Sequence, residues 1–165
     1  MRMDRLTSKF QMALADAQSV AVGRDHQFIE PAHLLTALLD QEGGTVRHLL
    51  AQADVNVNQL RSALGEALDR LPAVQGAAGD VHVSNELGRL LNQTDKLAQQ
   101  RKDQYISSEL FVLAAVEDKG AIGDIMRKSG ASKGALEKAI EQVRGGQSVD
   151  DPNAEIGRAS CRERV

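Results

Sequence analysis

Apolar residues recur along most of the chain at the three- and four-residue spacing of an amphipathic helix, and one long stretch of this pattern occurs twice. The matched positions are Leu6, Phe10, Ala13, Leu14, Ala17, Val20 and Ala21 in the first copy, and Val83, Leu87, Leu90, Leu91, Thr94, Leu97 and Ala98 in the second. The offset between the copies is 77 residues. Thr7 and Ser84 correspond, and each hydroxyl can accept a first-turn amide hydrogen as an N-cap. The pattern predicts two long helices that begin alike.

A second pair of segments has the same offset. "FIEPAHLLTALLDQEG" starts at Phe28 and "YISSELFVLAAVEDKG" starts at Tyr105. They predict helices over Pro31–Gln41 and Ser108–Asp118, the first with proline at N1, where its missing N–H costs nothing. Further apolar positions match at an offset of 76, which a single deletion explains: Val46, Leu49, Leu50, Leu60 and Leu64 match Ile122, Ile125, Met126, Leu136 and Ile140.

Each half is therefore predicted to form four helices. The expected fold is all-α: eight helices in two four-helix repeats related by a pseudo-twofold axis. Repeat one covers about residues 1–75 and repeat two about 80–146, with the small-residue connector 71–80 between them. Neither half alone has much core, so we expect one domain over residues 1–146. A ligand groove is expected at the seam between the halves.

The periodicity ends near Arg144. Residues 147–155 are rich in Gly, Ser, Asp and Pro and are predicted to be a linker. Residues 156–165, "IGRASCRERV", have no apolar pattern and, when back-translated, resemble read-through of a common sequencing adapter. We exclude them from functional reasoning, together with the only cysteine, Cys161. The chain is expected to be the N-terminal fragment of a longer protein.

The composition excludes several classes of protein. Charged residues make up 26% and hydrophobic residues 42%, the balance of a globular chain, and only 2% are aromatic, which favours an aliphatic helical core. A net charge of -3 without a basic face argues against a nucleic-acid partner. No apolar run approaches the roughly 20 residues that span a bilayer, so no membrane role is expected. With no disulfide framework, a cytoplasmic location is the simpler expectation.

Catalytic motifs are absent from the sequence. No phosphate-binding loop, H-E-x-x-H or C-x-x-C pattern occurs, and "SGASKGALEK" is interpreted as a turn between helices. His26, His33, His48 and His82 are scattered and do not pair at helical ligand spacing, so no metal site is expected; His33 is interpreted as a partly buried imidazole bonded near its helix start. We expect no enzymatic activity and no cofactor in this fragment.

Glu109 admits two interpretations. A carboxylate in the first turn of a helix is stabilised by the helix dipole by about 0.3 to 1 kcal/mol, which is a sufficient reason for its presence. Alternatively, Asp103 lies in the turn before the same helix, so two carboxylates can meet at one end of the seam. There they could bind backbone amides or a basic side chain of an extended peptide. Ala32 is the counterpart of Glu109, so the repeat fold itself needs no acid at this place.

Several long segments carry a family resemblance: "LTSKFQMALADAQSVA", "FIEPAHLLTALLDQEGG", "LLNQTDKLAQQRKDQYISSELFVLAAVE" and "AIEQVRGG". They resemble the N-terminal Clp-repeat domain of ClpB-type bacterial AAA+ disaggregases, over about residues 1–154. The resemblance implies a domain that engages unfolded or aggregated polypeptide through an apolar groove and helps deliver it to a hexameric ATPase working with the DnaK chaperone system. ATP, magnesium and hexamer formation are expected only of the full-length parent.

The resemblance also implies substrate-contact residues. Thr7, Asp103 and Glu109 match polar positions at the groove edge, and Leu91, Leu97 and Leu110 are candidates for its apolar wall, although their spacing suits core positions equally well. Two other functions stay open at this point. One is an adaptor-docking N-domain of a ClpA- or ClpC-type protease subunit. The other is a helix-turn-helix DNA binder, which the mixed charge of "SKGALEKAIEQVR" disfavours.

Overall fold

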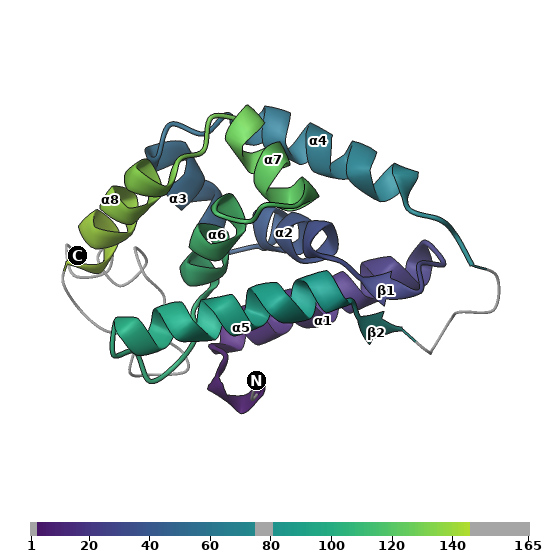
Figure 1. Ribbon diagram of the computed structural model, residues 1–165, viewed down its shortest axis with the longest axis horizontal. Coiled ribbons are helices and arrows are strands. Elements are labelled where there is room, and N and C mark those ends of the chain that lie inside the picture. Colours follow the sequence, from purple (N-terminus) through teal and green to yellow (C-terminus); the bar gives the residue numbers. More distant parts are fainter. Residues whose placement is uncertain (1–2, 75–80, 146–165) are drawn as a thin grey trace.

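The computed structural model describes residues 3–74 and 81–145, and these residues form eight α-helices (Figure 1). The elements are the 3₁₀ helix η1 (Met3–Arg5), α1 (Ser8–Gly23), β1 (Phe28–Ile29), α2 (Pro31–Asp40), α3 (Val46–Gln52), α4 (Val57–Arg70), β2 (His82–Val83), α5 (Asn85–Gln100), α6 (Ser108–Val116), α7 (Ala121–Lys128) and α8 (Lys133–Arg144). The all-α prediction is confirmed. The predicted linker and the adapter-like tail lie outside the described residues, as do residues 75–80 of the connector.

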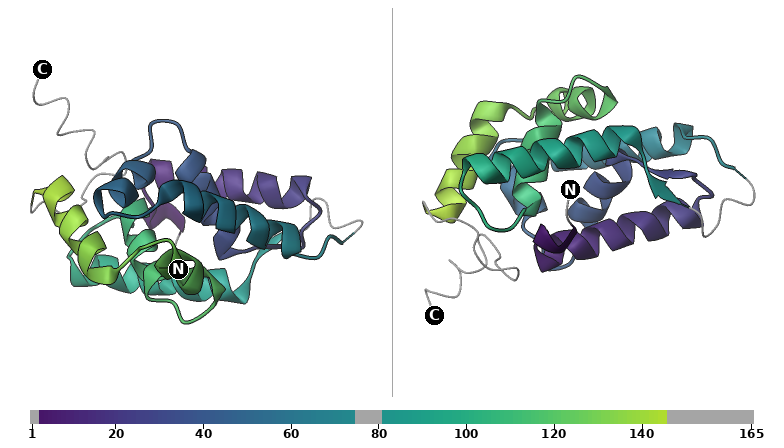
Figure 2. Two further views of the ribbon diagram at one scale, coloured as in Figure 1. Left: turned by 90° about the horizontal axis from the view of Figure 1, so that it is seen from above. Right: turned by 60° about the horizontal axis from the view of Figure 1, so that its bottom comes forward.

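The helices lie in three levels (Figure 1). The short helices α2 and α6 occupy the centre, and nearly all of their residues are buried, which explains why their sequences are apolar on every side. The long helices α1 and α5 lie along one side of this pair. Helices α3, α4, α7 and α8 cover the other side, and Figure 2 shows the same arrangement from two further directions.

The helix starts confirm the predicted caps. The Thr7 hydroxyl accepts a hydrogen bond from the Phe10 amide at the start of α1, and the Ser84 hydroxyl accepts one from the Leu87 amide at the start of α5. Pro31 is the first residue of α2, as expected. Asn56 at the start of α4 and Ser132 at the start of α8 form a matching pair of N-caps, because each side chain accepts a hydrogen bond from a first-turn amide of its helix. Matching caps at matching places are what a duplicated sequence predicts.

The turns also repeat between the halves. Asp25, after α1, and Lys102, after α5, both have a positive φ, of 58° and 61°. Asp54 and Gly130 form a second such pair, with φ of 64° and 99°. In each turn the chain adopts a left-handed conformation to leave its helix. The backbone therefore preserves the two-repeat arrangement even where the residue types have diverged.

The two halves are joined by short parallel pairings that the apolar pattern did not reveal. In one, Ile29 of the first half pairs with Val83, and the Ser84 amide donates to the Ile29 carbonyl at 3.1 Å. In its counterpart, Leu6 pairs with Ile106 of the second half, and the Thr7 amide donates to the Ile106 carbonyl at 3.0 Å. Each half thus contributes its first residues to a pairing with the other half.

One hydrophobic core runs through both halves. Phe10 of α1 and Phe111 of α6 are fully buried, and their ring centroids lie 5.9 Å apart. Around them the core consists almost entirely of Leu, Ile, Val and Ala. The expectation that the halves pack together as one unit agrees with this continuous core.

Candidate functional site

Two clefts lie between the halves, in places related by the duplication. The first cleft is lined by Phe28, Glu30, Pro31, Ala32, Ala67, Arg70, Leu71, Ser84, Asn85, Glu86, Ala121, Ile122, Asp124, Ile125 and Lys128. The second is lined by Thr45, His48, Leu49, Glu109, Ile140 and Val143. The offsets of the repeat map Ala32 onto Glu109, and Ala67 onto Val143. The two clefts are therefore counterparts, formed by the start of α2 or α6, the end of α4 or α8, and α7 or α3.

The clefts differ greatly in size. The first has a volume of about 720 Å³, enough for several side chains of a ligand, whereas the second has only about 10 Å³, roughly the space of one water molecule. The apolar residues that line the first cleft include the buried Ile122, the half-buried Ile125 and Phe28, which is 42% exposed. Of these two clefts between described residues, the first has the room for a segment of peptide size.

Charged side chains of both signs surround the first cleft. Glu30, Glu86 and Asp124 provide carboxylates, and Arg70 and Lys128 provide cations. The second cleft instead has one buried acid, Glu109, on its wall. The mixed rim can pair with either charge on a bound segment, so it does not restrict the ligand to one sign of charge.

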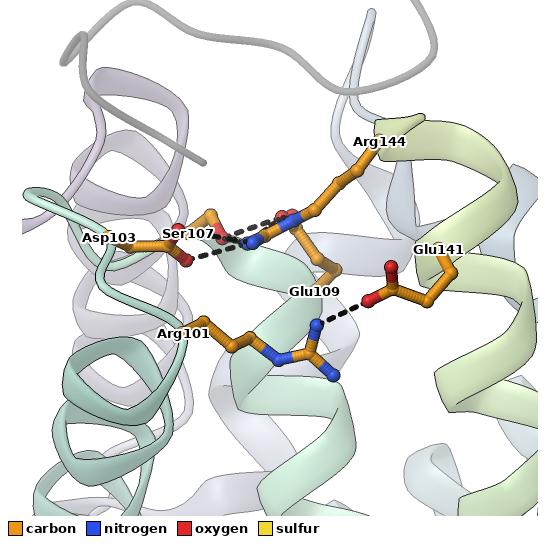
Figure 3. Close-up of polar contacts among 6 residues, drawn as sticks. All are labelled: Arg101, Asp103, Ser107, Glu109, Glu141 and Arg144. Carbon is orange, nitrogen blue, oxygen red and sulfur yellow. Dashed lines mark hydrogen bonds and ion pairs between the residues drawn. The ribbon is translucent and has the colours of Figure 1, made fainter. Parts of the chain in front are cut away.

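The Arg144 side chain forms a buried ion-pair cluster with Glu109, the acid that lines the second cleft. It is the last residue of α8, and its guanidinium is buried between Asp103, Ser107 and Glu109 (Figure 3). Nη2 lies 2.9 Å from both Asp103 Oδ2 and Glu109 Oε1. Nε donates to the same Glu109 oxygen at 3.3 Å, and Nη1 donates to Asp103 Oδ1 at 3.2 Å. The Ser107 hydroxyl accepts from Nη2 at 3.1 Å and donates to Glu109 at 2.6 Å.

Arg144 keeps its charge because its partners compensate for its burial. Burial by itself would lower the pKa of Arg144, but the charges of Glu109 and Asp103 and their hydrogen bonds outweigh it, so the pKa of Arg144 is raised. A guanidinium with three of its nitrogens bonded to carboxylates and a hydroxyl is a strong arrangement. A second ion pair, Arg101 with Glu141 at 2.8 Å, lies beside it and is partly exposed (Figure 3).

Of the polar residues predicted from the sequence, Glu109 lines the second cleft. Asp103 and Glu109 are both 4% exposed and share Arg144, so the expectation that two carboxylates meet at one end of the seam agrees with the geometry. Thr7 is 2% exposed, and its backbone bond to Ile106 places it beside the same segment. In this structure none of the three presents its side chain to solvent.

The apolar residues predicted from the sequence lie elsewhere. Leu91 and Leu110 belong to the core, with 4% and 0% of their surface exposed, and Leu97 is partly buried against it. The first cleft contains none of the three. The spacing of Leu91 and Leu110 had allowed either a groove wall or a core position, and in this structure both residues lie in the core.

Two of the histidines form a buried pair that their spacing in the sequence did not reveal. His26 and His33 do pair: the Nδ1 of His26 and the Nε2 of His33 lie 2.8 Å apart inside the protein. The Glu30 amide donates to His33 Nδ1, so the proton of His33 must sit on Nε2 and is donated to His26. Burial, together with the charge of the other histidine, lowers the pKa of His33 to about 4. The bond from the Glu30 amide matches the interpretation of His33 as an imidazole bonded near its helix start, and the pair with His26 forms across a turn, outside the helical ligand spacing that the sequence analysis considered.

Among the described residues, no group of three His, Cys, Asp or Glu side chains could hold a metal ion. Within the same ranges, no helix combines the length and apolar character that crossing a membrane requires.

Comparison with known proteins decides the family. The model of the Clp repeat (R) N-terminal domain matches residues 5–129. The chain belongs to the family of Clp-repeat N-terminal domains. Chaperone protein ClpB of Vibrio cholerae is 59% identical over 155 residues, which cover 94% of this chain and 18% of that protein. ClpB of Pseudomonas putida is 54% identical over 158 residues, covering 96% and 18%. This Clp N-domain is therefore of the ClpB chaperone type and spans about 18% of the length of those relatives.

Solved structures share the fold of this Clp N-domain. The Hsp104 N-terminal domain from Candida albicans superposes with a TM-score of 0.80 at 23% identity, over 91% of this chain and 98% of that one. The N-domain of ClpV in complex with a VipB peptide superposes with a TM-score of 0.69 at 21% identity, over 87% and 89%. At these identities the likeness concerns the fold alone.

Two features of the Clp N-domain escaped the sequence analysis. The first cleft depends on side chains from five elements, β1, α2, α4, α5 and α7, which no single motif records. Arg144 carried one signal: its counterpart in the first repeat is Leu68, a core residue that is 2% exposed. A charged residue at a position where the repeat has a buried leucine indicates a buried partner of opposite charge.

Proposed function

We propose that this chain is the substrate-binding domain of a ClpB-type disaggregase and that it holds segments of unfolded or aggregated polypeptide in the first cleft. The observation that carries the proposal is the large cleft between the repeats, with its apolar floor and mixed rim. An unfolded client exposes apolar side chains in an extended backbone, and such a segment fits a groove that is apolar inside and polar outside.

The proposed contacts are tolerant of sequence. Ile122 and Ile125 offer apolar surface, while Glu86 and Lys128 offer opposite charges at the rim. Removing about 100 Å² of apolar surface from water contributes on the order of 2.5 kcal/mol, against the cost of fixing a mobile segment. Binding to one domain is therefore expected to be weak. Several domains on one hexamer would raise the apparent affinity through effective concentration.

Thr7, Asp103 and Glu109 enter the proposal as polar contacts of the second cleft. Asp103 and Glu109 are buried around Arg144, and Thr7 is buried at the start of α1, so contact of these side chains with a client requires the region to rearrange. Leu97 is the partly buried member of the proposed apolar set, and Leu91 and Leu110 would reach a client only after the same rearrangement.

The wider setting is proposed from the relatives. Delivery of the client to an AAA+ hexamer, cooperation with the DnaK system, and the use of ATP and magnesium belong to the parent protein, with the cytoplasm as the compartment. The ClpB relatives favour this reading over adaptor docking in a protease complex. The ClpV N-domain, which has the same fold, has been solved with a bound peptide, and this supports peptide binding as a use of the fold.

Titration of the isotope-labelled 165-residue chain with a permanently unfolded model protein tests the proposal. We expect NMR shifts at first-cleft residues such as Ile122, Ala67 and Glu86. Ile125→Lys places a charge on the apolar floor and should weaken binding about tenfold, the effect of roughly 1.4 kcal/mol. Met12→Lys is the matched control, because Met12 is 55% exposed on α1 and lies outside the cleft. Shifts confined to other surfaces would overturn the proposal.

A further inference from the structure

A short loop of the chain, closed by the His26–His33 pair, forms one wall of the first cleft. His26 follows α1, and His33 is the third residue of α2. Their ring nitrogens lie 2.8 Å apart, and both residues are buried, with 5% and 0% of their surface exposed. Between them in the chain lie four residues that line the cleft: Phe28, Glu30, Pro31 and Ala32. The pair therefore holds together the two ends of a cleft wall.

Backbone bonds fix the rest of this loop. The His26 amide donates to a carbonyl of α1 at 2.8 Å, and Ile29 in the middle of the loop pairs with Val83 of the other half. At the far end, the Glu30 amide donates to His33 Nδ1 at 2.9 Å, which gives a partner to a backbone donor at the start of α2. Of these contacts, the two that the histidine rings make respond to a proton.

The hydrogen bonds of the pair leave no place for another proton. In the neutral pair, His33 Nδ1 accepts from the Glu30 amide, and His33 Nε2 donates to His26 Nδ1. Each neutral imidazole has one acceptor nitrogen, so these two Nδ1 atoms are the only acceptors of the two rings, and both are already in use. A proton added to either ring therefore places two N–H groups face to face and breaks one of the two bonds.

The charged groups around the pair do not offset this penalty. Burial is the largest cause that lowers the pKa of both histidines, and the charge of Arg24 adds to it. Asp25 and Glu30 act in the opposite direction on the first histidine without reversing the shift. From α4, Asp69 pairs with Arg24 at 2.9 Å, and from β2, His82 lies opposite β1 in the parallel pairing. The closed loop therefore favours the neutral pair.

We propose that the His26–His33 pair is a proton-sensitive clamp on the first cleft: the neutral pair holds the wall in its binding position, and a proton on the pair releases the wall. The proposal rests on the function proposed above and adds its regulation. Opening one loop takes much less free energy than unfolding a domain, so the wall can move while the core helices stay in place. Client binding and proton binding then oppose each other by the same factor. Acidification is expected to weaken client binding.

Hydrogen exchange of the 165-residue chain without a client tests the clamp. A histidine with a pKa of about 4 in the closed loop and 6.5 in the open loop shifts the balance toward the open loop about twentyfold between pH 7 and pH 5. Protection of the Glu30 amide, corrected for the intrinsic pH dependence of exchange, should fall by about that factor. It should also stay well below the protection of Val112 in the buried helix α6, because the loop opens without global unfolding.

Variants assign the fall in protection to the pair. His33→Gln should abolish it, and His48→Gln, at an exposed histidine of α3, should keep it. His33→Asn, whose Oδ1 takes the place of Nδ1 as the acceptor for the Glu30 amide, replaces His33→Gln if the latter does not fold. Equal protection of Glu30 and Val112, or a Glu30 protection that does not change with pH, would overturn the proposal.

Client affinity tests the coupling to the first cleft. A histidine-free unfolded polypeptide, titrated while the NMR shift of Ile122 is followed, should bind the original chain and His48→Gln at least threefold more weakly at pH 5 than at pH 7. The affinity of His33→Gln should change less than twofold. Absence of shifts at Ile122 at pH 7 would refute the proposed function, and the exchange measurement would still decide on the clamp. Binding of equal affinity to the original chain at both pH values would refute the regulation.

Discussion

Acidification should destabilise this domain through the buried histidine pair. The pKa of His33 is lowered from 6.5 to about 4 by burial and by its neighbour His26. Between these two values the unfolded chain binds a proton at this residue and the folded chain does not. The stabilising contribution is therefore complete above pH 6.5 and is lost as the pH falls toward 4. Integrating the difference from pH 7 to pH 4.5 gives a loss of about 2 kcal/mol in the free energy of unfolding.

Urea unfolding of the 165-residue chain at a series of pH values measures this loss. His33→Gln removes the titrating group while leaving an oxygen that can accept from the Glu30 amide, as in a capping box. The free energy of unfolding of this variant should therefore vary less with pH than that of the original chain, by about 2 kcal/mol between pH 7 and 4.5. The control is the same substitution at a histidine outside the pair, His82→Gln on β2. Equal slopes for the original chain and His33→Gln would refute the reasoning.

Three further predictions concern stability and are read from urea unfolding. Arg144→Ala removes the guanidinium that pairs with the buried Asp103 and Glu109 and should lower the free energy of unfolding by about 3 to 5 kcal/mol. Arg101→Ala breaks the partly exposed pair with Glu141 and should lower it by less than about 1 kcal/mol. Similar losses in the two variants would contradict the assignment of the Arg144 pair as the buried one. Gly123→Ala should destabilise the domain, because the new Cβ would clash with the Asp118 carbonyl oxygen. Gly88→Ala on α5, where a Cβ meets nothing within 4 Å, should stabilise the domain by about 0.5 to 1 kcal/mol. A more stable Gly123→Ala than Gly88→Ala would be inconsistent with the packing of α7. Thr7→Ala removes the cap of α1 and should cost about 1 kcal/mol, and a neutral result would show that the Phe10 amide finds another partner.

The helical fold could be predicted because its signals are periodic and repeated. The apolar series of α1 and α5, with Thr7 and Ser84 at their starts, gave both the helix positions and the duplication. The parallel pairings could not be predicted, since a strand of two residues such as Phe28–Ile29 has no period to detect. These pairings depend on where the turns bring the chain, which is a property of the assembled core.

The candidate site was only partly accessible to sequence reasoning. Asp103 and Glu109 were found because two acids flank the start of one helix. Their partner Arg144 lies 35 residues beyond Glu109, and a single arginine at the end of an amphipathic helix looks like an ordinary favourable charge there. The first cleft depends on the small volume of Ala32 where the other repeat has Glu109. Sequence patterns predict what is buried, but they do not predict which space between buried elements stays empty.

The exchanged pairings between the repeats also bear on how the chain folds during synthesis. Leu6 pairs with Ile106, which lies 100 residues further along the chain, and Ile29 pairs with Val83, so neither pairing can form before its second partner is synthesised. Closing such long loops costs entropy before any contact forms, so these pairings should appear late and limit the folding rate. The first repeat emerging from a ribosome would keep the start of α2 unpaired until the second repeat begins, and the start of α1 unpaired until Ile106 has followed. A domain proposed to handle unfolded chains would thus itself depend, until late in its synthesis, on protection of its apolar surface.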